Sequence, residues 1–481
     1  MQYQSTRGSA SPVNSAEAVL MGLAPDGGLY LPVEIPAFDW KKCVGSDTFS
    51  MATQILSAFL PDIPDMETLV RRAYTGKFET DDLTPTVSVG DFSVLELFRG
   101  PTSAFKDVAL SMLPQLMTAA RAAAGMEEDI LILTATSGDT GKAALEGFKD
   151  VPGIGICVFY PDGGVSDVQR RQMVSQEGAN VTVCAVRGNF DDAQTGVKNI
   201  FSACQGKEMK RRLSSANSIN IGRLAPQITY YFRSYRDLLD KGVIRLGDEV
   251  NFSVPTGNFG DILAGWLAKR LGLPVGRLIC ASNANNVLTD FIRTGTYDRR
   301  RPLHKTASPS MDILVSSNLE RLLYLLSGDT NLVAELMKQL SQDGVYTVPD
   351  ELKEKIQSEF WAGWCDDAQG AGTIGRVWKE LGYLCDTHTA SGWAVAENYV
   401  NQTGDTRPMV VLSTASPYKF PAAVLAAIGG NTDGDEFTLM ERLNSLTGVT
   451  IPKNLAGLKE KPELHKTVID KDEMLDFVMG L

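Results

Sequence analysis

Histidine is scarce in this sequence, with three among 481 residues, and none of the three lies at a spacing typical of zinc ligands. No Gly-x-Ser-x-Gly motif supplies a serine nucleophile. The seven cysteines are scattered and form no Cys-x-x-Cys pair, which is typical of reduced structural thiols. Zinc-dependent and serine-triad chemistries are therefore not favoured, and we assign no catalytic role to His304, His388 or His465.

Basic residues are also fewer than acidic residues. The chain carries 46 Lys and Arg against 58 Asp and Glu, a net charge of −12, which argues against binding to nucleic-acid phosphates or an anionic membrane. No apolar run approaches the roughly 20 residues needed to span a bilayer. Residues 1–22 lack the basic and then apolar pattern of a secretory signal. We therefore expect a cytoplasmic protein with a small-molecule substrate and no evident obligate protein partner.

The length and composition indicate a globular protein of two or three domains, since 43% of the residues are hydrophobic and 22% charged. Strand and helix patterns alternate in the middle of the chain, whereas its two ends show few such units. We expect an N-terminal lobe at 1–90, a core at 91–430 and a C-terminal extension at 431–481, the last made of short helices and loops.

Three short β-branched segments are each followed by a small-residue turn and a helical stretch. The expected strands are 130–134, 250–254 and 409–412, with turns at 136–141, 256–260 and 413–417 and helices at 142–149, 261–271 and 422–428. Further strands are expected at 154–160 and 181–186. Strands that alternate with helices predict parallel sheets covered by helices, an α/β fold.

These turns are candidate anion sites, because the N-terminus of a helix offers free N–H groups and a positive dipole end. Turns at the carboxyl ends of parallel strands also converge on one crevice. Each turn taken alone could be only a tight connection. The nucleotide-binding P-loop pattern is incomplete, since Thr136 replaces its first glycine and Ala143 replaces the Ser or Thr after its lysine.

Lys106 lies between an expected strand end at 95–98 and an expected helix. An amine placed at such a junction, opposite anion-binding turns, suits Schiff-base chemistry, because burial lowers its pKa and exposes the free amine. On this placement alone, an ordinary surface lysine remains an alternative.

The segment around Lys106, LFRGPTSAFKD at 97–107, resembles the cofactor-lysine motif of threonine synthases. The resemblance spans nearly the whole chain, with its motifs in order: STRG at 5–8, GLAPDGGLY at 22–30, ATSGDTG at 135–141, NSINIGR at 217–223, PTGNFGD at 255–261 and STASPYKF at 413–420. It implies a pyridoxal-phosphate enzyme of the β-family, or fold type II, with two parallel-sheet α/β subdomains around a cofactor cleft. The implied reaction converts O-phosphohomoserine and water to L-threonine and inorganic phosphate, by γ-elimination and addition of water at Cβ.

The resemblance also implies residues that hold the cofactor. Lys106 would bind pyridoxal 5'-phosphate as a Schiff base and then move protons. Thr414 would meet the pyridine nitrogen, and Asp139 would lie near the 3-hydroxyl. The cofactor phosphate would be bound by the loop Gly257, Asn258, Phe259 and Gly260, with Asp261 at the start of the next helix. Asp261 and Thr414 could instead only cap helices.

A second anion site is implied for the substrate. The loop 136–141 would bind its carboxylate and phosphate through Thr136, Ser137, Gly138 and Thr140. Asn217, Ser218 and Arg223 match the family site for the substrate phosphate, and the planar fork of an arginine suits phosphate oxygens. No residue suggests a metal site.

Three alternatives and three departures accompany this interpretation. A phospholyase on the same fold is distinguished by its products, a 2-oxo acid and ammonia. A hydroxyamino-acid dehydratase would not need the second anion site. A catalytically silent binding protein would lack the lysine. The chain departs from the usual family motif at Ser416, at Tyr418, and before His388, where a proline is often found. None of these departures removes a residue assigned to the chemistry.

Overall fold

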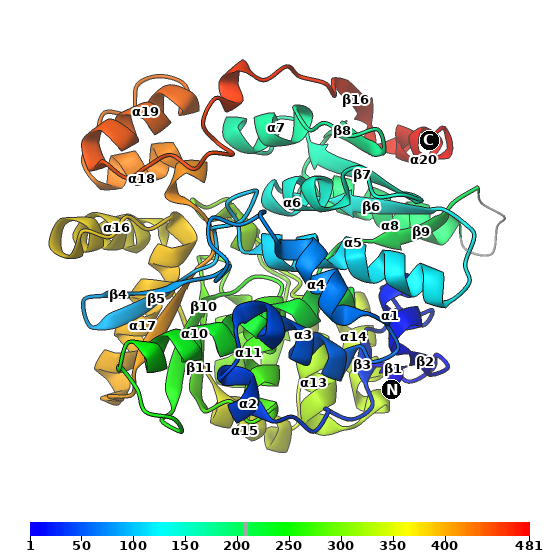
Figure 1. Ribbon diagram of the computed structural model, residues 1–481, viewed down its shortest axis with the longest axis horizontal. Coiled ribbons are helices and arrows are strands. Elements are labelled where there is room, and N and C mark those ends of the chain that lie inside the picture. The colour runs from blue at the N-terminus through cyan, green and yellow to red at the C-terminus, as the bar shows by residue number, and fades with distance from the viewer. Residues whose placement is uncertain (205–209) are drawn as a thin grey trace.

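Two mainly parallel sheets organise the chain in a computed structural model that describes residues 1–204 and 210–481 (Figure 1). The six-stranded sheet has the order β14 (Phe360–Trp364), β11 (Val275–Ser282), β10 (Val250–Pro255), β15 (Met409–Ser413), β5 (Phe92–Glu96) and β4 (Thr86–Val89). Only β4 runs antiparallel to its neighbour in this sheet. The five-stranded sheet is parallel throughout, in the order β16 (Thr467–Asp470), β8 (Val181–Arg187), β7 (Ile154–Pro161), β6 (Ile130–Ala135) and β9 (Arg212–Ser215).

The chain crosses between the two sheets through α5 (Lys106–Ala123), which follows β5 and leads to β6. Helices α6 (Asp139–Phe148) and α8 (Phe190–Cys204) pack against the five-stranded sheet. Helices α11 (Gly260–Arg270), α12 (Val287–Thr294) and α17 (Thr387–Thr403) pack against the six-stranded sheet. The two sheets lie on either side of α5 (Figure 1). Lys106 is the first residue of α5, so it stands where the chain passes from one subdomain to the other.

The remaining elements complete these layers. The helices are α1 (Ser15–Met21), α2 (Trp40–Val44), α3 (Thr48–Phe59), α4 (Met66–Tyr74), α7 (Asp167–Val174), α9 (Ile221–Leu224), α10 (Ile228–Asp240), α13 (Leu319–Ser327), α14 (Thr330–Gln342), α15 (Asp350–Glu359), α16 (Asp367–Leu381), α18 (Pro421–Ala427), α19 (Glu436–Thr447) and α20 (Met474–Met479). The 3-10 turns are η1 (Ala225–Gln227), η2 (Pro309–Met311), η3 (Pro417–Lys419), η4 (Leu458–Glu460) and η5 (Lys471–Glu473). Two small antiparallel sheets consist of β2 (Val13–Asn14), β1 (Gln2–Ser5) and β3 (Tyr30–Pro32), and of β12 (Thr296–Asp298) and β13 (Val345–Thr347).

The α/β fold with two parallel-sheet subdomains is confirmed, and the five predicted strands correspond to β6, β7, β8, β10 and β15 within a residue or two. Helix α6 begins three residues before the predicted start at 142, because Gly138 already serves as its N-cap. The expectation of only helices and loops after residue 430 is wrong. Strand β16 lies in this segment and pairs with β8, so residues 467–470 extend the five-stranded sheet.

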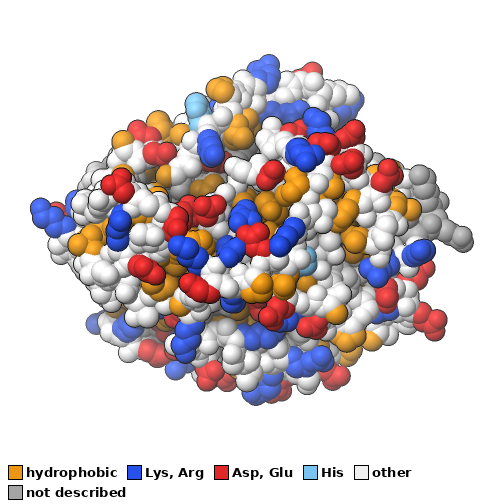
Figure 2. All heavy atoms as spheres, turned by 90° about the horizontal axis from the view of Figure 1, so that it is seen from above, with side chains coloured by type: hydrophobic (Ala, Val, Ile, Leu, Met, Phe, Trp, Pro, Cys, Tyr) orange, Lys and Arg blue, Asp and Glu red, His pale blue; other side chains and the backbone are white. Residues whose placement is uncertain are grey.

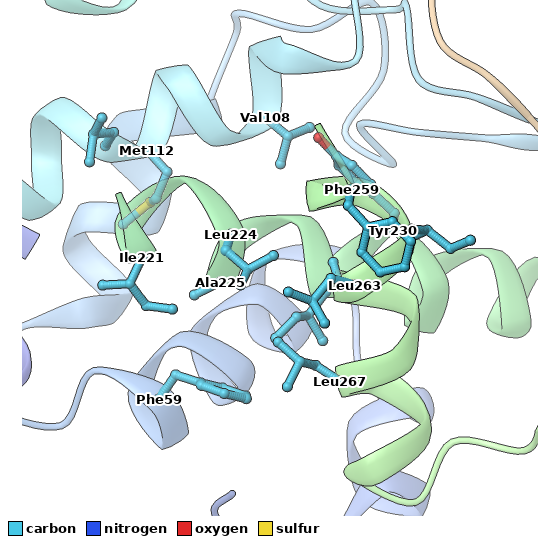
Figure 3. Packing of buried hydrophobic residues seen from close by; sticks show 14 of the residues in the cluster. Phe59, Val108, Met112, Ile221, Leu224, Ala225, Tyr230, Phe259, Leu263 and Leu267 are labelled. Carbon is cyan, nitrogen blue, oxygen red and sulfur yellow. The ribbon is translucent and has the colours of Figure 1, made fainter. Parts of the chain in front are cut away.

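A continuous hydrophobic core lies beneath α5. In Figure 3, Met112 of α5 approaches Ile221 of α9, and Val108 of α5 lies beside Phe259, with Leu224 and Leu263 nearby. All are at most 1% exposed. Burying each such side chain stabilises the fold by roughly 1.5–3 kcal/mol, so this packing fixes the helix that carries Lys106.

Three further findings concern the surface charge, the cysteines and the helices. Basic and acidic side chains are interspersed over the face in Figure 2, so neither sign dominates it. All seven cysteines are buried and none forms a disulfide. Among the described helices, none combines the length and the apolar character that a bilayer crossing requires.

Candidate active site

A cavity of about 1790 Å³ collects almost all of the predicted site residues from distant parts of the sequence. Its wall includes Lys106, Thr136, Ser137, Thr140, Asn217, Ser218, Arg223, Gly257, Asn258, Phe259, Gly260, Asp261 and Thr414. Gly138 and Asp139, from the same loop as Thr136, lie outside this lining. The carboxyl ends of β5, β6, β10 and β15 therefore meet at one crevice, as the parallel order predicts.

Lys106 is held by hydrogen bonds that tie its loop to the end of β15. The N–H of Phe105 donates to the Thr414 carbonyl at 2.8 Å, and the N–H of Ser416 donates to the Ser103 carbonyl at 3.1 Å. Within the loop, Asp107 accepts from both the N–H and the hydroxyl of Thr102, at 2.9 and 2.5 Å. The position of Lys106 relative to Thr414 is thus fixed by the backbone itself.

The amine of Lys106 is unusually easy to deprotonate. Burial lowers the pKa of Lys106 to about 8, and the positive charges of Arg223 and Lys419 act in the same direction. Asp139 opposes this effect through its negative charge. Near neutral pH a usable fraction of the amine is therefore free to attack a carbonyl group.

The 136–141 loop is shaped by Thr136 and Gly138. The Thr136 hydroxyl accepts hydrogen bonds from the N–H groups of Gly138 and Gly141, both at 2.9 Å, so its role as an acceptor is structural. Gly138 has a φ of 134°, and a Cβ atom there would lie 2.4 Å from the Gln169 side chain. This tight turn places Ser137 and Thr140 on the cavity wall, while Asp139 is buried directly beside them.

Asp139 forms a buried ion pair that the sequence analysis did not anticipate. Its Oδ1 lies 2.5 Å from Nζ of Lys419 and accepts from Nε2 of Gln169 at 2.9 Å. Burial alone would raise the pKa of Asp139, but Lys419 and Lys106 outweigh it and hold that pKa below its usual range. Asp139 is therefore a carboxylate at neutral pH and can only accept hydrogen bonds.

The 257–260 loop presents free N–H groups at the start of α11. Its carbonyl groups are occupied, because Gly257 accepts from the Ser316 hydroxyl at 2.8 Å and Asn258 accepts from the N–H and side chain of Asn318, both at 3.1 Å. Within the described residues, no acceptor takes the N–H groups of Asn258, Phe259 or Gly260. Phe259 holds a left-handed φ of 62°, and a Cβ on Gly257 would lie 2.9 Å from the Ser310 carbonyl. Unpaired amides at a helix N-terminus fit a phosphate dianion.

Neither Asp261 nor Thr414 caps a helix, which was the alternative role for each of them. Asp261 forms no cap of α11; its Oδ1 accepts from the Tyr231 hydroxyl at 3.1 Å, and its Oδ2 has no partner in the described chain. Burial raises the pKa of Asp261 to about 7. Ser416 rather than Thr414 caps η3, because its hydroxyl accepts from the N–H of Tyr418. Thr414 lies on the cavity wall, where its hydroxyl is available for a ligand.

Arg223 is a buried guanidinium with unused donors. It is 2% exposed, its Nη1 donates to the Ala216 carbonyl at 2.5 Å, and its Nε has no partner in the part of the chain that the structure describes. Burial lowers the pKa of Arg223 to about 10, so the group is still charged at neutral pH. Among the described residues no carboxylate pairs with this cation, which suits the site to an anionic ligand, and Asn217 and Ser218 also line the cavity wall.

A second buried arginine, Arg321 of α13, joins the two predicted anion sites. It is fully buried and donates to the carbonyl groups of Ser218 at 3.3 Å and Ile219 at 2.6 Å, in the loop that precedes Arg223. It also donates to Oδ1 of Asn318 at 2.5 Å, the residue that binds the carbonyl of Asn258. One guanidinium therefore sets the separation between the 217–223 and 257–260 loops.

Replacement of Arg321 by methionine is expected to lower the free energy of unfolding by about 3–5 kcal/mol, because the buried acceptors of Tyr30, Ser218, Ile219 and Asn318 lose their donor. Urea unfolding measures this loss. Arg71→Met is the matched control, since Arg71 pairs with Glu67 on the surface and should change stability by less than about 1 kcal/mol. Equal effects of the two substitutions would contradict the assigned role.

Three functional groups on or beside the cavity were missed in the sequence: Lys419, Arg321 and His388. Nδ1 of His388 lies 2.9 Å from the Asp386 carboxylate, and its Nε2 accepts from the N–H of Ser310 at 3.2 Å. Since Ser310 packs against Gly257, His388 supports the wall of the phosphate loop. No local pattern around His388 indicates this role, because its partner Ser310 lies in a distant part of the chain.

The charge of the cavity wall is opposite to that of the whole chain. Eight Lys and Arg residues line it against five Asp and Glu residues, whereas the chain has a net charge of −12. Such a wall favours an anionic ligand over a neutral one.

Comparisons with known proteins point to one family. The family described as Threonine synthase N terminus matches residues 2–74, and Threonine synthase, C-terminal matches residues 389–475. A threonine synthase from Pseudomonas aeruginosa is 42% identical over 435 residues, which cover 88% of this chain and 90% of that protein. A threonine synthase-like 1 protein from Macaca fascicularis is 39% identical over 95% of this chain, which spans 62% of the length of that protein.

A solved structure agrees over the whole length. The crystal structure of PLP-bound threonine synthase from Brucella melitensis superposes with a TM-score of 0.87 at 40% identity, covering 100% of this chain and 99% of that one. The similarity therefore includes both subdomains and the N- and C-terminal segments.

Proposed function

Because this chain belongs to the threonine synthase family, we propose that it is a lyase that uses pyridoxal 5'-phosphate to convert O-phosphohomoserine and water to L-threonine and inorganic phosphate. One observation carries the proposal: a buried lysine with a pKa of about 8 shares a cavity with two separate loops whose N–H donors include several without a partner among the described residues. Two anion sites match a phosphorylated cofactor and a phosphorylated substrate.

The residues present fit the cofactor. The free N–H groups of Asn258, Phe259 and Gly260, at the positive end of α11, would bind its phosphate. Thr414 would meet the ring nitrogen and Asp139 the side of the ring that carries the 3-hydroxyl, with Asp261 behind the phosphate loop. When bound, pyridoxal phosphate supplies an electron sink for negative charge at the substrate Cα and Cβ. A hydroxyl at Thr414, unlike a carboxylate, does not hold the ring nitrogen protonated.

Lys106 performs the proton transfers. Its Nζ, with a pKa of about 8, can accept the proton from the substrate Cα and later return it. It lies on the cavity wall close to the groups that would hold the substrate, so a small movement of its side chain reaches neighbouring carbon atoms. We assign to it the Cβ and Cγ transfers as well, since no histidine ring nitrogen on this wall is unused: both nitrogens of His388 are engaged.

The substrate would be bound by residues of the 136–141 and 217–223 loops, which line the same cavity. Arg223 would bind the phosphate through its unused Nε and remaining donors, with Asn217 and Ser218. Ser137 and Thr140, with the turn fixed by Thr136 and Gly138, would hold the carboxylate. The seven buried thiols suit a reducing compartment, and we place the activity in the cytoplasm, with no nucleic-acid or membrane partner.

Product analysis tests the proposal. The purified full chain is mixed with pyridoxal phosphate and O-phosphohomoserine, and threonine, phosphate, 2-oxo acid and ammonia are quantified. We expect threonine and phosphate in equal amounts. A 2-oxo acid with an equal amount of ammonia would replace the proposal by the phospholyase alternative. Binding of the cofactor without any product would reject both activities.

A further inference from the structure

Lys419 is a second amine in the active-site region that has no role in the function proposed above. It is 0% exposed, and its Nζ lies 2.5 Å from Oδ1 of Asp139 and 3.2 Å from the Thr102 carbonyl. Lysine is almost never fully buried unless it is paired. The pair joins η3, after β15, to the first turn of α6 in the other subdomain.

The charged groups around Lys106 come from four elements: Asp107 from its own helix α5, Asp139 from α6, Arg223 from α9 and Lys419 from η3. The carboxylate of Asp107 is occupied by Thr102, and Arg223 is oriented by the Ala216 carbonyl. Asp139 is therefore the anion best placed to stabilise a charged Lys106, and Lys419 competes with Lys106 for it.

We propose that Lys419 is a positioning residue that neutralises Asp139 and thereby keeps the Lys106 amine uncharged and able to bind a carbonyl cofactor. The proposal rests on the proposed function in one respect, that Lys106 is the lysine which carries the cofactor. Asp139 and Lys419 together present no net charge to Lys106. Removing Lys419 leaves a buried carboxylate whose nearest remaining cation is Lys106, so the two become a pair.

The cycle of substitutions that tests this uses the full chain without cofactor. Acetic anhydride at limiting concentration acetylates free amines, and mass spectrometry of the peptide containing Lys106 gives the pH of half-maximal labelling. We expect K419M to raise this midpoint by on the order of one pH unit, as a unit charge does at short range inside a protein. We expect K419M/D139N to return it to near the wild-type value, since the carboxylate has also been removed.

A second variant, K419Q, tests whether the shift expected for K419M could result from misfolding. K419Q can still donate a hydrogen bond to Asp139 but carries no charge, so it should raise the midpoint in the same direction as K419M. K269M is the matched control: Lys269 also pairs with a carboxylate, Glu359 at 2.6 Å, but lies at the end of α11 remote from the site. It should leave the Lys106 midpoint unchanged.

The results separate this inference from the proposed function. An unchanged or lowered midpoint in folded K419M or K419Q, or a midpoint that stays raised in K419M/D139N, would overturn the role of Lys419. Failure of the wild-type chain to gain visible absorbance with pyridoxal phosphate would instead refute the proposed function, and the labelling experiment does not depend on that outcome.

Discussion

Replacement of Lys106 by alanine is expected to abolish the visible absorbance of the chain loaded with pyridoxal phosphate and to lower threonine formation by at least about 10³-fold. Lys106 is the amine on the cavity wall whose pKa burial lowers to about 8. The alanine variant loses both the covalent attachment and the base that moves protons at Cα. Absorbance spectra and initial rates with O-phosphohomoserine measure the two losses.

Because Lys419 is a second buried lysine near the site, the experiment must also show which of the two lysines carries the cofactor. Among the described residues Lys419 is the lysine within ion-pair distance of Asp139, and that pair occupies its amine. Reduction with borohydride followed by mass spectrometry should therefore place the cofactor on Lys106 in the wild type and nowhere in the variant. Lys149→Ala, at an exposed pair with Glu177, is the control and should retain full activity. A cofactor attached to Lys419 would contradict the assignment.

The loading reaction should also depend on pH in a defined direction. The free amine is the form that attacks the carbonyl, so the rate of cofactor attachment to the wild-type chain should rise with pH and level off above about pH 8. An exposed lysine would continue to gain reactivity up to about pH 10.

The sequence could predict the parts of the site that follow from local patterns. Each predicted turn, at 136–141, 256–260 and 413–417, lies at the carboxyl end of the predicted strand, and parallel pairing brings the three together. The limits of the five expected strands were predicted to within one residue, because short β-branched runs between turn residues leave few alternatives. Lys106 could be singled out because it lies between an expected strand end and an expected helix start.

The groups that escaped prediction act through partners remote in sequence. Lys419 and Asp139 are 280 positions apart, and neither lies in a pattern that implies the other. Arg321 binds loops about 100 residues away through backbone carbonyl groups, which every residue type offers. Strand β16 escaped because a four-residue strand at a sheet edge, with a mostly exposed surface, has no hydrophobic pattern to mark it. Pairings of this kind are set by tertiary packing and not by local preference.

Arg223 and Arg321 are both buried arginines, but their surroundings assign them opposite contributions to stability. Arg321 donates to four acceptors, whereas within residues 1–204 and 210–481 the Arg223 side chain donates only to Ala216 and its Nε has no partner. A buried charge without a counter-ion destabilises the folded protein, and replacing it by an apolar group of similar size is often neutral or stabilising. Arg223 thus destabilises the folded protein without ligand, and binding of an anionic ligand offsets this destabilisation.

Arg223→Met is therefore expected to lower kcat/KM for O-phosphohomoserine by about 10²–10³-fold, since a charge-assisted bidentate contact to phosphate is lost. The free energy of unfolding without ligand should stay the same or rise by about 1 kcal/mol. Arg321→Met should show the reverse pattern in stability, with a clear loss. Steady-state kinetics and urea unfolding of the two variants give both comparisons.

Inorganic phosphate supplies a direct test of the same site in the loaded protein, where the 257–260 loop would be occupied by the cofactor. Phosphate at 100 times its dissociation constant should stabilise the wild type by about 2.7 kcal/mol, because it binds the folded state alone. Arg223→Met should lose most of this gain, since its cavity wall no longer presents the guanidinium. If phosphate protects both proteins equally, the substrate anion binds elsewhere, and the role given to Arg223, Asn217 and Ser218 is wrong.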